Sequence, residues 1–61
     1  MNGYYAKVIA VLQSHGFFLK RQKGSHQTWS NGKTPVTVST NCNSRHTANG
    51  IMKDAGIDHR F

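Results

Sequence analysis

One histidine of this chain stands in a short segment whose residue types suit chemistry on phosphate. His26 follows Lys23, Gly24 and Ser25, and no carboxylate precedes Asp54. Histidine is the side chain that changes its charge closest to neutral pH, so an imidazole can accept and return a proton there. In a basic segment that lacks carboxylates, this chemistry indicates cleavage of RNA phosphodiester bonds rather than a reaction that uses paired acids.

The expected reaction at His26 begins at a ribose. A neutral imidazole would take the proton of a 2′-hydroxyl, and the resulting alkoxide would attack the adjacent phosphate. The products would be a 2′,3′-cyclic phosphate and a free 5′-hydroxyl. We expect Lys20, Arg21 and Lys23 to bind phosphate and stabilise its oxygens, so that no metal ion or other cofactor is needed. Gly24 would let the backbone approach the substrate. The alternative for His26 is an exposed histidine beside a turn.

The remaining histidines fit structural roles better. His15 is expected at a helix C-terminus, where a protonated imidazole interacts favourably with the helix dipole. His46 could touch substrate from a loop, and His59 is expected to be solvated in the tail. These histidines and Cys42 match no spacing of zinc ligands, so we expect no metal site.

Composition points to a small domain with a polyanionic partner. The chain has 61 residues, enough for one domain with a thin core, so any site must lie on the surface. Eight Lys and Arg residues against two acidic residues, Asp54 and Asp58, give a formal net charge of +6, which favours nucleic acid as the partner. The two aspartates are expected to be solvated rather than to act as an acid and base pair.

Membrane insertion and export are not expected. No apolar run approaches the roughly 20 residues that span a bilayer, and the first residues lack the pattern of a signal peptide. Cys42 has no second cysteine to pair with, which favours a reducing, cytoplasmic location.

Two helices are predicted at the two ends of the chain. The first runs from about residue 3 to residue 15, with Asn2 as its cap and Gly16 in the left-handed position after its end. The second covers about eight residues after a cap at Thr47 and ends at Gly56. Gly50, inside it, is expected where another backbone comes close. Apolar residues fall at helical spacing on one face of each: Tyr5, Val8, Ile9 and Leu12, then Ala48, Ile51, Met52 and Ala55. Ile57 and Phe61 should attach the tail to the core.

Three strands are predicted between the helices, at 17–22, 26–30 and 34–39. In the second strand, Gln27 and Trp29 should share one side, and His26 and Thr28 the other. Asn31-Gly32 predicts a two-residue hairpin turn, since both positions tolerate a positive φ. Val36 and Val38 should face the core, while Pro35 favours an edge. Phe18 is the best candidate for an exposed ring that could stack on a base.

The resulting order is α-β-β-β-α. It predicts an α+β domain in which two helices cover one face of a three-stranded antiparallel sheet.

A run of residues around His26 resembles a known family. Gly16-Phe17, Arg21-Gln22-Lys23-Gly24-Ser25-His26, and the segment 51–57 are similar to the HicA toxin family of prokaryotic toxin–antitoxin systems. The likeness covers nearly the whole chain. It implies a fold like that of double-stranded-RNA-binding domains, ribosome-independent cleavage of mRNA that arrests growth, and neutralisation by a HicB-type antitoxin that covers the active site. The family's catalytic histidine falls on His26.

Three positions depart from the family pattern. Ser39 and Asn41 stand where the family usually has a proline and, two residues on, a histidine; His46 replaces a glycine before the second helix. The loop 39–46 is therefore expected to bind RNA or antitoxin differently. If a loop histidine assists catalysis in the family, His46 is the candidate substitute.

Two other functions stay open at this stage. A non-catalytic RNA-binding module with the same fold would bind RNA with a steep salt dependence and leave it intact. A protein-interaction domain would use its basic surface for an acidic partner and would not bind RNA at moderate salt.

Overall fold

The order α-β-β-β-α predicted from the sequence is confirmed. The computed structural model describes residues 3–61. It contains five elements: α1 (Tyr5–Ser14), β1 (Phe18–Lys23), β2 (His26–Ser30), β3 (Pro35–Ser39) and α2 (Arg45–Ala55). The strands form one antiparallel sheet in the order β1-β2-β3. None of the helices in this part of the chain is long and apolar enough to cross a membrane.

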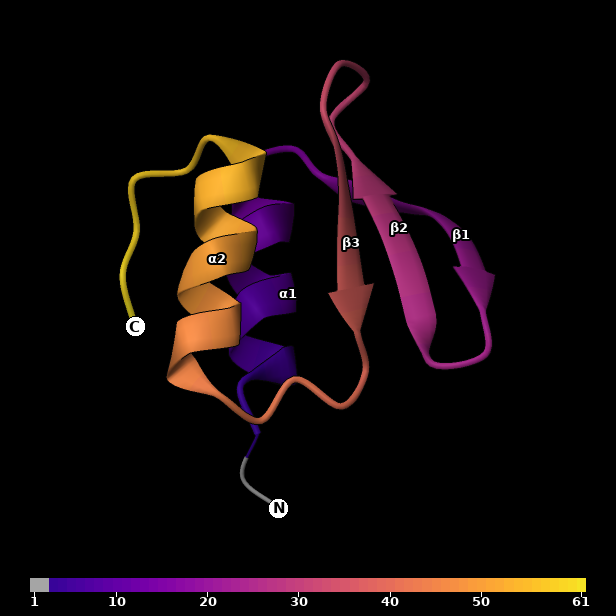
Figure 1. Ribbon diagram of the computed structural model, residues 1–61. Coiled ribbons are helices and arrows are strands. Elements are labelled where there is room, and N and C mark those ends of the chain that lie inside the picture. Colours follow the sequence, from indigo (N-terminus) through magenta and orange to yellow (C-terminus); the bar gives the residue numbers. More distant parts are fainter. Residues whose placement is uncertain (1–2) are drawn as a thin grey trace.

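Both helices lie on the same side of the sheet. In Figure 1, α2 lies in front of α1, and the strands follow in the order β3, β2 and β1 away from the helices. Helix α2 contacts α1 and β3. The largest fully buried side chains are Leu12, Met52, Val8 and Val38. The core therefore forms where the two helices meet β3 and β2, as the helical and strand spacing predicted.

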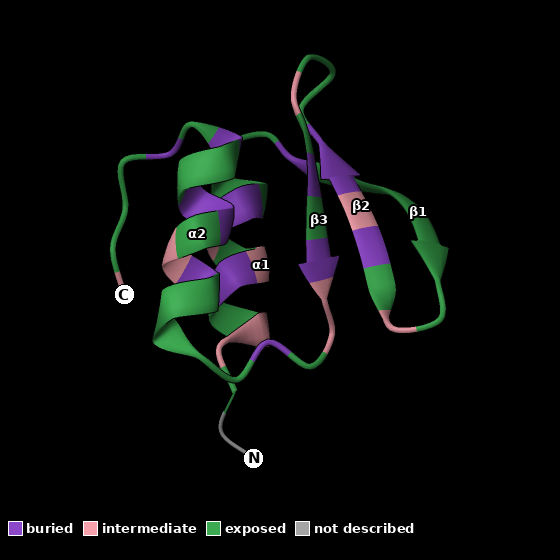
Figure 2. Ribbon diagram, viewed as in Figure 1, coloured by how far each residue is buried: buried purple, intermediate pink, exposed green. Residues whose placement is uncertain are grey.

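Strand β1 lies outside this core. Every residue of β1 is exposed, while β2 and β3 carry the buried residues of the sheet (Figure 2). The only large hydrophobic side chains that the described residues expose are Phe18 and Leu19, at the start of β1. The exposed ring expected at Phe18 is thereby confirmed, and Leu19 adds a second apolar side chain beside it.

Helix α1 ends as the sequence indicates. Gly16 has a φ of +83°, the N–H of Gly16 donates to the Gln13 carbonyl, and the N–H of Phe17 donates to the Leu12 carbonyl. This pair of hydrogen bonds is a Schellman motif, which turns the chain directly into β1. The start of the helix differs, because Tyr4 occupies the cap position. The predicted cap, Asn2, lies outside the described residues.

Helix α2 begins earlier than predicted. Ser44 is its N-cap and accepts a hydrogen bond from the N–H of His46. The prediction of a cap at Thr47 was wrong because Ser44 offers the same hydroxyl one turn earlier. The close backbone contact expected at Gly50 was also wrong, since a Cβ at this position would meet no atom within 4 Å.

The loop between β2 and β3 is longer than a two-residue turn. Ser30 pairs with Pro35, so four residues connect the strands. The Asn31 side chain accepts hydrogen bonds from the N–H groups of Lys33 and Thr34, at 2.9 and 2.8 Å. These bonds satisfy two backbone donors inside a four-residue loop, which takes the place of the predicted Asn31-Gly32 turn.

Candidate nucleic-acid interface

His26 is presented by a tight turn between β1 and β2. Lys23 pairs with His26 across the strands, which leaves two residues in the turn. Gly24 has a φ of +61°, and among residues 3–61 only glycines have a positive φ. A positive φ at the first of two turn positions is the pattern of a type II′ hairpin, which suits the twist of the flanking strands. The turn joins the second and third elements of the predicted order.

The outer face of the sheet, opposite the helices, carries a line of polar and basic side chains. Residues that pair directly in an antiparallel sheet point to the same face. His26 pairs with Lys23 on one side and Ser39 on the other, and Thr28 pairs with Arg21 and Thr37. His26, Lys23, Arg21 and Thr37 are exposed, and Thr28 and Ser39 partly so. We call these six residues the outer basic face.

This face carries no carboxylate. Asp54 lies on α2 and Asp58 in the tail, and both side chains are exposed. A cationic surface without acids attracts phosphate and other anions. Of the predicted phosphate-binding residues, Arg21 and Lys23 lie on the same face as His26.

Lys20 is placed differently from its basic neighbours. It is the extra residue of a bulge, because Leu19 pairs with Trp29 and Arg21 with Thr28, the next residue back along β2. Bulges bend a strand and increase its twist. Lys20 is exposed but has no cross-strand partner, so the structure does not join it to His26 through the sheet.

A hydrogen-bonded network holds the strand of His26 from the helix side. The Gln27 side-chain oxygen accepts from the Tyr5 hydroxyl at 2.8 Å and from the Trp29 indole N–H at 2.9 Å. Its amide nitrogen donates to the Gln22 side-chain oxygen at 3.1 Å, and the Gln22 amide donates to the Gly24 carbonyl at 3.0 Å. The network connects α1, β2 and the turn. Sequence reasoning missed it, although a glutamine predicted on the same side as Trp29 was a signal.

The segment after β3 packs against the same turn. The N–H of Thr40 donates to the Ser25 carbonyl at 2.8 Å, and the Ser39 hydroxyl accepts from the N–H of Asn41 at 3.1 Å. Ser39 is thus beside His26, whereas His46, expected in the loop, lies in the first turn of α2.

The other titratable side chains have separate surroundings. His15 caps α1, and its Nδ1 lies 2.9 Å from the Val11 carbonyl, which confirms the expected position at the helix C-terminus. The ring of His59 packs edge-on against the ring of Phe61, with 4.6 Å between the ring centroids. Cys42 is buried, and burial raises the pKa of its thiol. Within residues 3–61, no group of three or more His, Cys, Asp and Glu side chains lies together.

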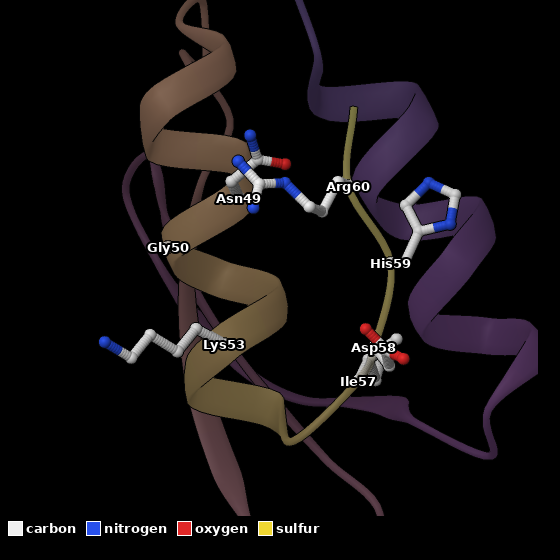
Figure 3. Close-up of a pocket in the computed structure, with 7 residues that line it drawn as sticks. All are labelled: Asn49, Gly50, Lys53, Ile57, Asp58, His59 and Arg60. Atoms are coloured by element: carbon white, nitrogen blue, oxygen red, sulfur yellow. The ribbon is translucent and has the colours of Figure 1, made fainter.

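A shallow hollow lies between α2 and the tail, away from the sheet. It is lined by Asn49, Gly50, Lys53, Ile57, Asp58, His59 and Arg60. In Figure 3, the Lys53 side chain points away from the tail, while Arg60 reaches toward Asn49. The Asn49 side-chain oxygen accepts from the N–H of Phe61 at 2.8 Å, and Ile57 is buried. The tail is thus attached as predicted, and the hollow shares no residue with the outer basic face.

Fold and site define a small basic α+β domain with a polar sheet face open to solvent. A family model described as HicA toxin of bacterial toxin–antitoxin matches residues 5–57, which include all five elements and His26. The chain therefore belongs to the HicA toxin family. No curated protein and no solved structure gives a significant match. Membership in this family supports a role as the toxin of a toxin–antitoxin pair.

Proposed function

We propose that this protein is an endoribonuclease toxin that cleaves mRNA with His26 as its catalytic histidine. The observation that carries the proposal is the position of His26, exposed between Lys23 and Ser39 on a face that has no carboxylate. Cleavage of mRNA would stop translation and growth in the cytoplasm. A HicB-type antitoxin would neutralise the toxin by covering this face.

The chemical step needs a base, a nucleophile within the substrate, and cations. The His26 imidazole takes the proton of the 2′-hydroxyl, and the 2′-oxygen forms a bond to phosphorus while the bond from phosphorus to the 5′-oxygen breaks. The leaving 5′-oxygen takes up a proton, and the proton that the imidazole has gained balances this step. The reaction as written needs no metal ion.

Two cations beside His26 would stabilise the charge that develops on the phosphate. Lys23 and Arg21 are at successive outward positions of β1, beside His26 and Thr28. Cations fixed before the reaction stabilise the phosphoryl oxygens more than mobile solvent ions do. Lys20 would act from the bulge as a further phosphate contact, and the turn at Gly24 and Ser25 would let the RNA backbone come close.

The alternative is an RNA-binding module of the same fold that does not cleave. It is supported by the same basic face and differs only in the role of the imidazole. Labelled RNA incubated with purified protein in the presence of EDTA separates the two functions. Cleavage by the wild type and its loss in His26→Ala support the nuclease. Intact RNA with retained binding supports the module.

A test in growing cells completes this comparison. Induced expression of the wild type should stop growth, and His26→Ala should not. The matched control is His59→Ala, which removes an exposed imidazole outside the sheet and should stay toxic. Equal toxicity of wild type and His26→Ala would refute a catalytic His26.

A further inference from the structure

Strand β1 is an open edge with two distinct ends. It pairs with β2 along one side only, and all six of its residues are exposed. The bulge at Lys20 divides it into an apolar end, Phe18 and Leu19, and a basic end, Arg21 to Lys23. An open strand edge offers unpaired backbone N–H and C=O groups that can bind another extended chain.

The two apolar side chains lie on opposite faces of the sheet. Leu19 pairs with the buried Trp29, so it points to the helix side, while Phe18 pairs with Ser30 on the outer side. They remain 45% and 52% exposed. RNA bound on the outer basic face would reach Phe18 but not Leu19. A chain that lies along the edge contacts both, because its own side chains alternate between the two faces.

The charge of the edge selects its occupant. β1 carries Lys20, Arg21 and Lys23 and no acidic residue. If a second copy paired antiparallel with its β1 centred on this one, Lys20 of each copy would face Arg21 of the other, and directly opposed like charges destabilise a strand pair. An acidic strand would instead place carboxylates opposite these cations.

We propose that β1 is the docking edge for an extended, acidic segment of a partner protein, which adds to the sheet as a fourth strand. Apolar side chains of that segment cover Phe18 and Leu19, and its carboxylates pair with Arg21 and Lys23. The inference deepens the proposed function, since it rests on the inhibitory partner and names the chemistry of the segment that binds.

The position of the edge gives such a partner a way to inhibit. β1 leads through the two-residue turn to His26, and Arg21 and Lys23 lie on both the edge strand and the outer basic face. A docked acidic strand would neutralise the cations that hold the phosphate. Partner and RNA therefore compete for the same charges.

The test uses two synthetic peptides and the whole chain. One peptide is long enough to span β1 and has valines at the end that lies beside Phe18 and Leu19, with glutamate alternating with valine along the rest; the other has lysine in place of glutamate. Binding is followed by NMR shifts of the backbone amides. We expect the acidic peptide to shift the amides of β1 and to displace RNA, and the basic peptide to do neither.

Two variants complete the test. Leu19→Ser should weaken binding of the acidic peptide about tenfold, since it removes apolar contact on the side of the sheet that RNA does not reach. The same variant should leave RNA cleavage unchanged. His26→Ala should bind the peptide like the wild type, so loss of the nuclease does not affect this result. The proposal is wrong if the acidic peptide leaves the β1 amides unshifted at millimolar concentration, if the basic peptide binds equally well, or if Leu19→Ser has no effect.

Discussion

The Tyr5 hydroxyl donates a hydrogen bond of 2.8 Å to the side-chain oxygen of Gln27, the residue that follows His26. This contact connects helix α1 to the strand that carries the candidate catalytic imidazole. Gln27 points toward the helices and His26 away from them. The packing of the helix side can therefore fix the position of a side chain that is itself exposed.

The first prediction concerns this network. Gln27→Leu keeps the volume but leaves the buried indole N–H of Trp29 without an acceptor. We expect a loss of about 2 kcal/mol in the free energy of unfolding, measured by urea denaturation. Tyr5→Phe removes one donor and leaves Gln27 its bond to Trp29, so it should lose only about 1 kcal/mol. Equal stability of Gln27→Leu and the wild type would contradict this role.

The second prediction compares two glycines that both have open space where a Cβ would stand. Gly24 has a φ of +61°, whereas Gly50 lies inside α2 without a positive φ. Gly24→Ala should destabilise the protein by about 1–2 kcal/mol, because L residues rarely adopt this conformation. Gly50→Ala should stabilise it by up to about 1 kcal/mol, because alanine favours the helix. Thermal unfolding measures both, and changes of the same sign would be inconsistent with the described backbone.

Much of the fold could be predicted because it follows from local spacing. The faces of both helices, the alternation along 26–30, and the left-handed glycine at residue 16 all depend on neighbours in the chain. The predicted start of α2 was wrong because Ser44 and Thr47 are both good caps, and the helix begins after the earlier one. The prediction of a two-residue turn after Ser30 was wrong because the Asn31 side chain accepts hydrogen bonds from the loop backbone. A rule based on turn dipeptides does not include such bonds.

The candidate site was predictable in its residues but not in its geometry. The sequence places Lys20, Arg21 and Lys23 near His26, yet only the strand pairing separates Lys20, in the bulge, from the two cations on the outer basic face. The hydrogen bond from Tyr5 to Gln27 and the pairing of Ser39 with His26 were not predicted, since they join residues far apart in the chain. Long-range register depends on the bulge, which the sequence does not indicate.

The third prediction concerns Cys42 and pH. Burial raises the pKa of its thiol above the unfolded value. Above the unfolded pKa of about 8.5, the unfolded chain binds fewer protons than the folded one, so this residue's contribution to stability falls as pH rises. The free energy of unfolding of the wild type should therefore fall more between neutral and alkaline pH than that of Cys42→Ala. This holds even though the variant is less stable at neutral pH. Urea denaturation across this pH range measures the difference, and parallel curves would contradict it.

The fourth prediction concerns phosphate contacts. A plot of the logarithm of the binding constant against the logarithm of salt concentration has a negative slope. Arg21→Gln and Lys23→Gln should each make this slope less steep by about 0.7 for single-stranded RNA. Lys33→Gln is the matched control, since Lys33 lies in the β2–β3 loop, at the other end of β2 from His26. Binding is measured with His26→Ala as background, so that RNA stays intact. If Lys33→Gln made the slope less steep by as much as Lys23→Gln does, the outer basic face would not be the binding surface.

One measurement tests the central claim directly: the rate and the product ends of RNA cleavage in EDTA by the wild type, His26→Gln and His59→Gln. We expect cleavage by the wild type and His59→Gln, with 2′,3′-cyclic phosphate and 5′-hydroxyl ends, and a cleavage rate at least about a hundredfold lower in His26→Gln. Cleavage by His26→Gln at the wild-type rate, or products with 5′-phosphate ends, would contradict it.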